Sequence, residues 1–397
     1  MGTNLTNLFL AKRTKSIRTS IIREILKITV KDSEFLSFAG GLPNPNLLPS
    51  ELIQLATEKT MSFNRSEALQ YGDSNGYRNL RSQILERFLD LKDLDLDSIC
   101  ITHGSQQSLD ILGKLLMDEE TNVLLEDPTY LGALQAFSPY EPKMFSLSLE
   151  ADGPDLLELE TILSKDKIHC FYCNPSYQNP STNTWSIAKR KQVASLLDEY
   201  GVILIEDEAY KYLDFSGEVF PSIASFRKNL DLTFVLGSFS KIISPGFRLG
   251  WTVVPKSYQK YFTAIKQGND LNSNQYSQIV MDHLLSNLNI DTHLAKIQMY
   301  YRKQKEHMRF CLAKYLPEVT YHDPLGGMFL WVNFPFVSEG EFMEKMMEKK
   351  VVMVPGNEFR LFGIESVFFR MNFSFLGEVE MEEGIRRMAS VYHDIIT

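Results

Sequence analysis

The feature that most constrains the fold is a regular alternation of short apolar runs and helical patterns between residues 97 and 255. Six apolar runs are candidate strands: 98–102, 122–126, 168–173, 202–206, 232–236 and 250–254. Between them, residues 105–117 and 188–200 carry apolar side chains at helical spacing. This alternation predicts an α/β fold with a mainly parallel central sheet and helices on both faces. Ligands of such sheets bind at the carboxyl ends of the strands.

The C-terminal third has a different pattern, which predicts a smaller α+β domain. A helical pattern covers 277–316, apolar strands follow at 328–332, 351–354 and 367–373, and a last helix lies near 379–394. The segment GGLPNP at 40–45 cannot continue a regular element. We therefore expect an N-terminal arm and small-domain segment at 1–45, a large domain at 46–285 and a C-terminal small domain at 286–397.

Composition excludes several classes of protein. Apolar residues make up 44% of the 397 residues and charged residues 23%, which is typical of a globular chain and not of a disordered one. The formal net charge is 41 − 50 = −9, so nucleic acid is not an expected partner. No apolar stretch approaches the roughly 20 residues that span a bilayer. Residues 1–13 lack the apolar core of a secretion signal, which predicts a cytoplasmic location. No metal site is predicted.

Lys241 is the first candidate for chemistry. It ends the sequence SFSK at 238–241, directly after the apolar run 232–236. A lysine beside a buried strand end loses solvation, which lowers its pKa and suits it to form a Schiff base. Ser238, Ser240 and Arg248 could together bind a phosphate group. A solvated loop lysine is the alternative, and the phosphate-binding neighbours weigh against it.

Asp207 and Tyr210 follow the apolar run 202–206. An acid at the carboxyl end of a central strand is placed to meet a ligand, and a buried Asp needs a cationic partner to stay ionised. A protonated pyridine nitrogen would be such a partner. A helix cap or a solvated acid is the alternative for Asp207, and core packing is the alternative for Tyr210.

Weaker signals come from three further places. Ser105 and Gln106 begin a predicted helix, whose free backbone N–H groups can bind an anion. Tyr130 could stack on a flat heterocycle, although core packing is its default. Arg370 interrupts an apolar strand, and a carboxylate held by two hydrogen bonds is its best partner. An outward-facing polar side of that strand is the alternative for Arg370.

Taken together, these residues resemble those of fold type I pyridoxal-phosphate enzymes, specifically the class I and II aminotransferases. The resemblance covers almost the whole chain. It is nearest to the branch of 2-aminoadipate and kynurenine aminotransferases, through the motifs IREILK at 22–27, FAGGLP at 38–43, LQYG at 69–72 and GGMFLW at 326–331.

The resemblance implies a role for each candidate. Lys241 would hold pyridoxal 5'-phosphate covalently and later move a proton. Asp207 would pair with the pyridine nitrogen, while Tyr210 and Asn179 would contact the ring hydroxyl oxygen. The other implied roles are phosphate binding by Ser105, Gln106, Ser238, Ser240 and Arg248, with Tyr71 from a neighbouring subunit; ring stacking by Tyr130; and substrate binding by Arg370, Asn179 and Gly41.

The implied activity is transfer of an amino group from an L-amino acid to a 2-oxo acid by a ping-pong mechanism, in a homodimer. Glutamate and 2-oxoglutarate are the expected pair on one side of the reaction, and residues 16–28 are expected to influence specificity. A β-elimination lyase would use the same lysine and stays open. A ligand-sensing regulator domain is disfavoured, because only about 35 residues precede the FAGG motif, too few for a DNA-binding head.

One departure from the family pattern lies beside Asn179. Ser181 and Thr182 stand where the family usually has Thr and Gly. Because threonine disfavours a positive φ, the turn behind Asn179 is expected to differ slightly.

Overall fold

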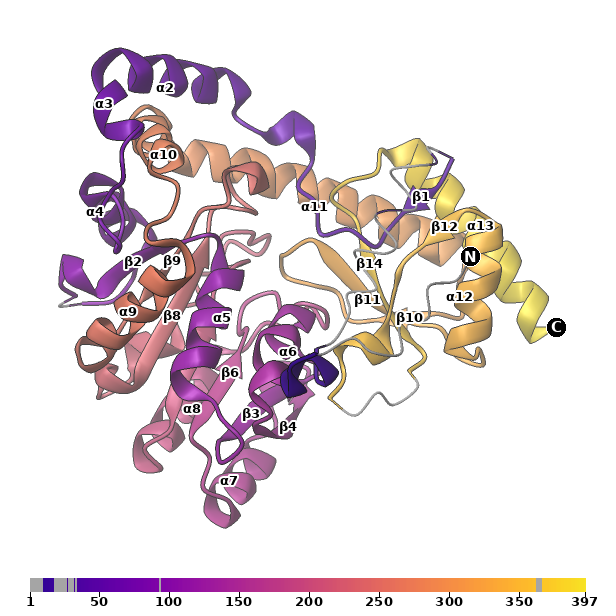
Figure 1. Cartoon of the computed structure of the whole chain (residues 1–397). Coiled ribbons are helices and arrows are strands. Elements are labelled where there is room, and N and C mark those ends of the chain that lie inside the picture. Colours follow the sequence, from indigo (N-terminus) through magenta and orange to yellow (C-terminus); the bar gives the residue numbers. More distant parts are fainter. Residues whose placement is uncertain (1–9, 18–26, 28–31, 33, 93, 362–365) are drawn as a thin grey trace.

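The computed structural model describes residues 10–17, 27, 32, 34–92, 94–361 and 366–397. Its largest unit is an eight-stranded sheet in the order β2-β9-β8-β7-β6-β3-β4-β5 (Figure 1). The strands are β2 (Ile99–Thr102), β3 (Asn122–Asp127), β4 (Lys143–Glu150), β5 (Gly153–Pro154), β6 (Cys170–Cys173), β7 (Ile203–Asp207), β8 (Thr233–Ser238) and β9 (Gly250–Val253). Strands β4, β3, β6, β7 and β8 are parallel, whereas β9 is antiparallel to both neighbours and β5 is antiparallel to β4. The expected mainly parallel sheet is confirmed.

All six expected strands are present, and the sequence analysis missed β4 and β5. β4 lies near the sheet edge, and most of its side chains are exposed or only partly buried. Its polar residues therefore interrupt the apolar run by which a central parallel strand is recognised.

Helices cover both faces of this sheet. Alternate strand residues point to opposite sides, so the apolar strands place apolar side chains on both faces, and helices bury them. On one face, Leu125 and Tyr172 pack with α5 (Ser105–Leu116), α6 (Leu131–Phe137) and α9 (Gln259–Asp270). On the other face, Leu124 and Phe171 pack with α7 (Leu156–Lys165) and α8 (Ile187–Glu199). Leu109 and Leu112 of α5 are buried as the helical spacing predicts.

The C-terminal part contains a smaller antiparallel sheet in the order β10-β11-β14-β13. Its strands are β10 (Thr320–Tyr321), β11 (Phe329–Asn333), β13 (Val354–Pro355) and β14 (Phe368–Asn372), and it is accompanied by α12 (Glu339–Glu348) and α13 (Glu378–Ile396). Near the N-terminus, β1 (Leu36–Ser37) pairs in parallel with β12 (Val351–Val352). An N-terminal segment therefore joins the C-terminal part, while the residue boundaries of the three expected parts stay a prediction.

The predicted helical region at 277–316 is two helices, α10 (Gln275–Asn287) and α11 (Ile290–Tyr315). The break falls at Asn289, whose side chain accepts a hydrogen bond from the backbone N–H of Thr292 and so begins α11. α11 runs from the large sheet to the small one (Figure 1). The remaining helices, α2 (Ser50–Phe63), α3 (Arg65–Ala68) and α4 (Arg78–Phe88), precede the large sheet in the chain.

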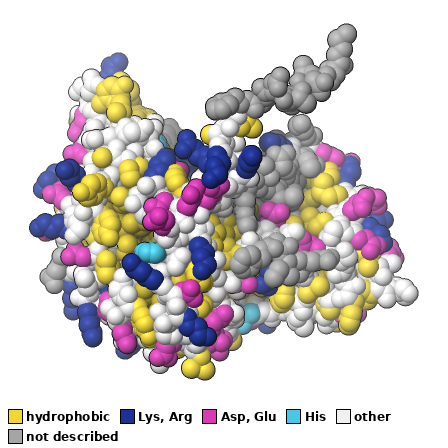
Figure 2. Space-filling model, turned by 60° about the horizontal axis from the view of Figure 1, so that its bottom comes forward, with side chains coloured by type: hydrophobic (Ala, Val, Ile, Leu, Met, Phe, Trp, Pro, Cys, Tyr) yellow, Lys and Arg dark blue, Asp and Glu magenta, His cyan; other side chains and the backbone are white. Residues whose placement is uncertain are grey.

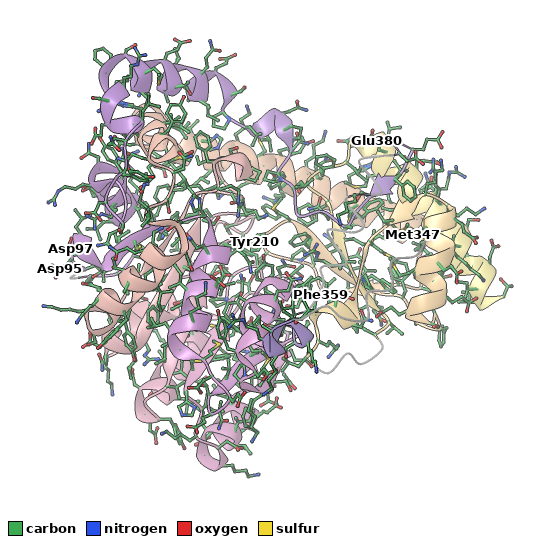
Figure 3. All side chains as sticks on the ribbon, viewed as in Figure 1. Asp95, Asp97, Tyr210, Met347, Phe359 and Glu380 are labelled. Atoms are coloured by element: carbon green, nitrogen blue, oxygen red, sulfur yellow. The ribbon has the colours of Figure 1, made fainter. Side chains whose placement is uncertain are left out.

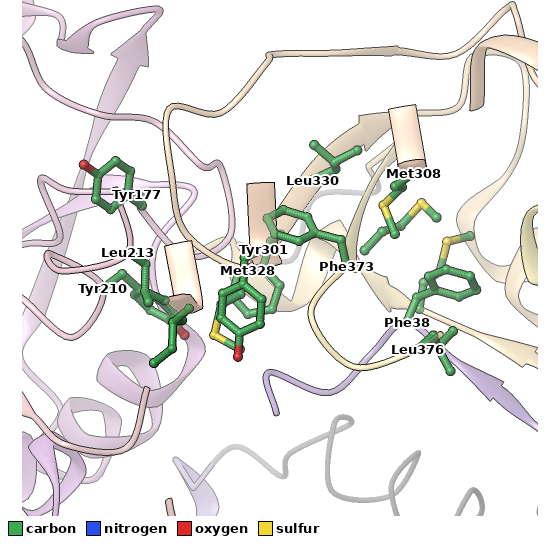
Figure 4. Close-up of a cluster of buried hydrophobic side chains, with 14 of the residues drawn as sticks. Phe38, Tyr177, Tyr210, Leu213, Tyr301, Met308, Met328, Leu330, Phe373 and Leu376 are labelled. Atoms are coloured by element: carbon green, nitrogen blue, oxygen red, sulfur yellow. The ribbon is translucent and has the colours of Figure 1, made fainter. Parts of the chain in front are cut away.

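One apolar cluster connects the two sheet regions. It includes Tyr210 and Leu213 beside the large sheet, Met328 and Phe373 from the small one, and Phe38 from the N-terminal segment (Figure 4). This shared core holds residues from both regions around Tyr210, which lies between them in Figure 3.

The outer surface is mixed in charge. Acidic and basic side chains are interspersed over the face drawn in Figure 2 and do not form a continuous patch of one sign. Within the described part of the chain, no helix is both long and apolar enough to cross a bilayer.

Candidate active site

A cavity of about 490 Å³ lies at the carboxyl ends of the central strands, beside the small sheet. Its lining comes from both regions, since Asp207 ends β7, Ser238 ends β8 and Arg370 lies in β14. The sequence-predicted site residues that line it are Gly41, Ser105, Gln106, Tyr130, Asn179, Asp207, Tyr210, Ser238, Ser240, Lys241, Arg248 and Arg370. Tyr71 is the one predicted site residue that does not.

Lys241 lies three residues beyond β8 and lines the cavity. Its Nζ donates a hydrogen bond to the carbonyl oxygen of Gly41, at 2.8 Å. Burial, together with the positive charges of Arg370 and Arg248, lowers the pKa of Lys241 to about 8. The solvated-lysine alternative is therefore wrong, and this amine is neutral, and so nucleophilic, far more often than an ordinary lysine.

Asp207 is almost completely buried, with 1% of its surface exposed. Its carboxylate accepts hydrogen bonds from the backbone N–H of Ala209 and the hydroxyl of Tyr172, both at 3.1 Å. Burial nevertheless raises its pKa to about 6. Among the described residues no lysine, arginine or histidine forms an ion pair with Asp207, so a bound cation such as a protonated pyridine nitrogen would complete this site.

Arg370 is buried as well, with 2% of its surface exposed, and the outward-facing alternative is wrong. Its guanidinium donates to Oδ1 of Asn179 at 2.7 Å and to the carbonyl oxygen of Ala39 at 2.6 Å. Its Nε is buried without a hydrogen-bond partner. In the part of the chain that the structure describes, no carboxylate pairs with it, so its positive charge is available to an anionic ligand.

Asn179 connects Arg370 with Tyr210. Besides accepting from Arg370, it donates from Nδ2 to the hydroxyl oxygen of Tyr210 at 3.4 Å. Burial raises the pKa of Tyr210, which therefore stays a neutral hydrogen-bonding group. Beside Asn179, Thr182 adopts a φ of +64°. The turn thus has a positive φ in spite of the threonine, at a cost of roughly 1–2 kcal/mol.

Six lining residues form what we call the phosphate cup, through hydroxyl, amide, guanidinium or backbone N–H groups: Gly104, Ser105, Gln106, Ser238, Ser240 and Arg248. Arg248 donates to Oγ of Ser240 at 3.5 Å and to the carbonyl oxygen of His103 at 3.4 Å. Ser105 and Gln106 begin α5, where backbone N–H groups have no partner inside the helix. These donors fit a phosphate group.

Gly104 is the residue that brings this turn close to Arg248. Its φ is +71°, in the left-handed region that favours glycine. A Cβ at this position would lie 3.0 Å from a terminal nitrogen of Arg248. Glycine therefore suits this backbone conformation and leaves room for the guanidinium beside the turn.

Two aromatic candidates differ in position. Tyr130 lies at the start of α6, lines the cavity and contacts Oε1 of Gln106 through its hydroxyl at 3.4 Å. Its stacking role stays a prediction. Tyr71 is 77% exposed and lies outside the cavity, so a role for it requires a second subunit.

Sequence analysis missed Glu126, a completely buried carboxyl group at the end of β3. Its Oε2 accepts hydrogen bonds from the backbone N–H of Asn174 at 2.9 Å and from Nε2 of Gln178 at 3.3 Å. Burial raises its pKa to about 8. The available signal was an acid that directly follows the apolar run of β3. Glu126 holds the segment that carries Asn179, but it does not line the cavity.

The expected N-terminal specificity segment, 16–28, lies almost wholly outside the described residues. Among the described residues, no cluster of three or more histidine, cysteine and acidic side chains could hold a metal ion.

Comparisons with known proteins find relatives over almost the whole chain. The model of the family "Aminotransferase class I and II" matches residues 44–388. The chain is 36% identical to a 2-aminoadipate transaminase of Thermus thermophilus, over 94% of this chain and 93% of that one. It is 33% identical to aromatic-amino-acid aminotransferase 1 of Thermococcus litoralis, over 96% of this chain and 93% of that one.

A solved structure has the same fold. It is an alpha-aminoadipate aminotransferase from Thermus thermophilus, complexed with N-(5'-phosphopyridoxyl)-L-leucine. The TM-score is 0.91 at 32% identity, and 98% of each chain is covered. The cavity described above offers an amine, an unpaired buried carboxylate and a phosphate cup, which are the groups that such a phosphopyridoxyl cofactor requires. The chain therefore belongs to the class I and II aminotransferases, and it is a pyridoxal-phosphate-dependent enzyme of fold type I.

Proposed function

We propose that this aminotransferase uses glutamate and 2-oxoglutarate as one substrate pair and accepts a range of L-amino acids as the other donor. The observation that carries the proposal is the position of Lys241, whose pKa is about 8, in one cavity with Arg370 and Asp207, neither of which forms an ion pair with any described residue. An amino acid substrate brings a carboxylate that can pair with Arg370, and the cofactor brings a cationic nitrogen that can pair with Asp207.

In this proposal the lining residues that the sequence analysis named bind the cofactor and the substrate. Lys241 holds the cofactor covalently, and Asp207 keeps its ring nitrogen protonated. Tyr210 and Asn179 contact the ring oxygen, Tyr130 stacks on the ring, and the phosphate cup binds the phosphate. Arg370 binds the α-carboxylate of the substrate, next to the backbone of Gly41.

The same residues explain the proton movement. Pyridoxal phosphate, when bound, supplies an electron-withdrawing ring that weakens the Cα–H bond of the amino acid. Once the amino group of the substrate has taken its place on the cofactor, Nζ of Lys241 would be a free neutral amine, able to take the Cα proton and return it at the cofactor carbon to which the lysine had been attached. Because donor and acceptor use the same cavity, the first 2-oxo acid has to leave before the second enters, which is the basis of ping-pong kinetics.

The lining of the cavity supports a broad donor range. Leu42, Leu131 and Phe329 contribute apolar surface to the cavity, and Gln135 contributes a polar amide. Such a lining accommodates apolar and aromatic side chains, with one group that can hydrogen-bond to a polar end. The names of the relatives, which specify aromatic amino acids and 2-aminoadipate, agree with this range.

The proposal includes a homodimer in which Tyr71 reaches the partner's phosphate cup. Tyr71 is highly exposed, and so are the nearby apolar residues Phe63 and Leu69. Apolar side chains grouped in this way are typical of a surface covered by another subunit. Mixed dimers of Lys241→Ala and Tyr71→Ala test this point, because a shared site would restore one complete cup and one active lysine to the same cavity.

The cytoplasmic location stays a prediction.

The central test is a visible absorption scan of the purified, cofactor-loaded enzyme with single amino acids, including glutamate, 2-aminoadipate, and aromatic, branched and sulfur amino acids. Conversion of the cofactor band by an amino acid, and its recovery with 2-oxoglutarate, is the expected result and ranks the donors. An unchanged band with accumulating pyruvate and ammonia would instead establish a lyase. Recovery only with 2-oxo acids other than 2-oxoglutarate would overturn the proposed pair.

A further inference from the structure

Behind the phosphate cup lies a polar cluster that does not line the cavity: Lys266 and Asp270 of α9, Gln107 of α5, and Ser273. Lys266 is completely buried, with 0% of its surface exposed. Its Nζ contacts both carboxylate oxygens of Asp270 at 2.9 Å and Oγ of Ser273 at 2.9 Å. A buried ammonium group is costly unless it is fully paired, and here three oxygens pair it.

The cluster is connected to the cup through one amide side chain. Gln107 donates from Nε2 to Oδ2 of Asp270 at 2.8 Å, and its Oε1 accepts the backbone N–H of His103 at 2.8 Å. Gln107 therefore links a buried ion pair on one helix to the turn that precedes the other. The imidazole of His103 also lies 3.3 Å from the same carboxylate oxygen of Asp270.

The turn held in this way is the one that forms the cup. His103 comes directly before Gly104 and Ser105, and its carbonyl oxygen accepts from Arg248. Ser273, another member of the cluster, donates from Oγ to the carbonyl oxygen of Ile101 in β2, at 3.1 Å. The polar cluster thus forms hydrogen bonds to the backbone at two positions, Ile101 in the strand and His103 in the turn, which are two residues apart in the chain.

We propose that Gln107, supported by Lys266 and Asp270, is a positioning residue for the phosphate cup and is required for tight binding of the cofactor's phosphate group. Gln107 touches neither the cavity nor the reacting atoms. Its amide fixes the backbone of His103, and therefore the direction of the free N–H groups at the start of α5. A phosphate bound by several preoriented donors loses affinity when the donors are no longer held in place.

This inference rests on the assignment of the cup to the cofactor's phosphate, and the experiment separates the two. Apoenzyme is titrated with pyridoxal 5'-phosphate and with pyridoxal, which has the same ring and aldehyde but no phosphate. The dissociation constant for pyridoxal, divided by the dissociation constant for pyridoxal phosphate, measures how much the cup contributes to cofactor affinity. A wild-type ratio near one would show that the cup assignment itself is wrong.

The variant to test is Gln107→Leu, which keeps the size of the side chain and removes both hydrogen bonds. We expect its dissociation constant for pyridoxal phosphate to rise about tenfold, which is the scale of one lost hydrogen bond to a charged group, with little change for pyridoxal. The ratio then falls by the same factor. A wild-type ratio in Gln107→Leu would overturn the positioning role.

Gln83→Leu is the matched control, since Gln83 of α4 also donates to an aspartate on another helix, Asp282 of α10, away from the cup. It is expected to keep the wild-type ratio. An equal fall in Gln83→Leu would show a general loss of stability and would contradict the proposal. If Gln107→Leu does not fold, Asp270→Asn provides the same test, because it removes the charge that pairs with Lys266 and weakens the hydrogen bond from Gln107. An unchanged ratio in Asp270→Asn would then overturn the role.

Discussion

The phosphate cup and the carboxyl groups near the ends of β3 and β7 differ in the elements that carry them and in their contact with water. Arg248 of the cup is exposed, and Gly104, Ser105 and Gln106 come from the turn into α5 and its first residues. Ser238, which ends β8, and Ser240 are buried. Glu126 is the penultimate residue of β3, while Glu206 and Asp207 are the last two residues of β7, and at most 1% of the surface of each is exposed. Burial raises the pKa of all three groups.

The difference shows which part of the site depends on the fold as a whole. A buried carboxyl group is fixed by the packing of the sheet, and its charge depends on the ligand that pairs with it. The cup consists of several donors that each contribute a little, so it tolerates the loss of one. Changes at Asp207 and at Lys241 should therefore act on the chemistry, and changes in the cup on cofactor affinity.

The largest expected effect comes from Lys241→Ala, which removes the amine that moves the proton. Loss of a general acid and base typically costs 10²- to 10⁴-fold, and because the same residue holds the cofactor we expect a loss of about 10⁴-fold in kcat. Steady-state transamination at saturating pyridoxal phosphate measures it. Lys228→Ala, at an exposed position, is the control. Turnover near wild type in Lys241→Ala would refute the assignment of the site.

Asp207→Asn is expected to lower kcat by about 10²- to 10³-fold, since the amide keeps the shape but not the charge that pairs with a cationic nitrogen. The apoenzyme should be no less stable, because a buried carboxylate without a cationic partner is itself costly. Kinetics of the loaded enzyme and thermal melting of the apoenzyme check the two parts.

Glu126→Gln sharpens this prediction, since Glu126 is a buried strand-end acid that does not line the cavity. Its kcat should stay within a few-fold of wild type. A loss as large as that of Asp207→Asn would mean that burial of an acid at a strand end, and not contact with the ligand, decides its role.

The pH dependence of cofactor attachment tests whether Lys241 has a lowered pKa. The pKa of about 8 means that the neutral amine increases as the pH rises through 8. The rate at which apoenzyme develops the visible band with pyridoxal phosphate should therefore rise about tenfold between pH 7 and pH 9 and then level off. A rate that keeps rising beyond pH 10 would indicate an ordinary, solvated lysine.

Ser240→Ala in the cup is expected to have a small effect, which is confined to cofactor affinity. It removes one neutral hydroxyl among several donors, so the dissociation constant of pyridoxal phosphate should rise about three- to tenfold. At saturating cofactor, kcat should be unchanged. A large drop in kcat with unchanged cofactor affinity would erase the distinction between the cup and the strand-end acids.

Much of the site follows from local sequence, because each residue carries its own signal. Lys241 and Asp207 stand directly after apolar runs that become central strands, and parallel strands bring their carboxyl ends to one edge. Ser105 begins a helix that the spacing of apolar residues in the sequence predicts. Those signals could not show Gln107 or Lys266, which are ordinary polar residues at helical positions until two helices meet.

The sequence by itself determined the parallel sheet, the chain order of its central strands and many of the cavity residues, since periodicity and residue chemistry are local properties. Asn179 and Gly41 were expected only from the resemblance to the family. The tertiary structure alone decided that Arg370 faces inward, that Thr182 adopts a positive φ, and that Glu126 and Lys266 are buried among hydrogen-bond partners. Each of these depends on side chains far apart in the chain. Burial and charge pairing are properties of the packed assembly of elements, and no single segment contains them.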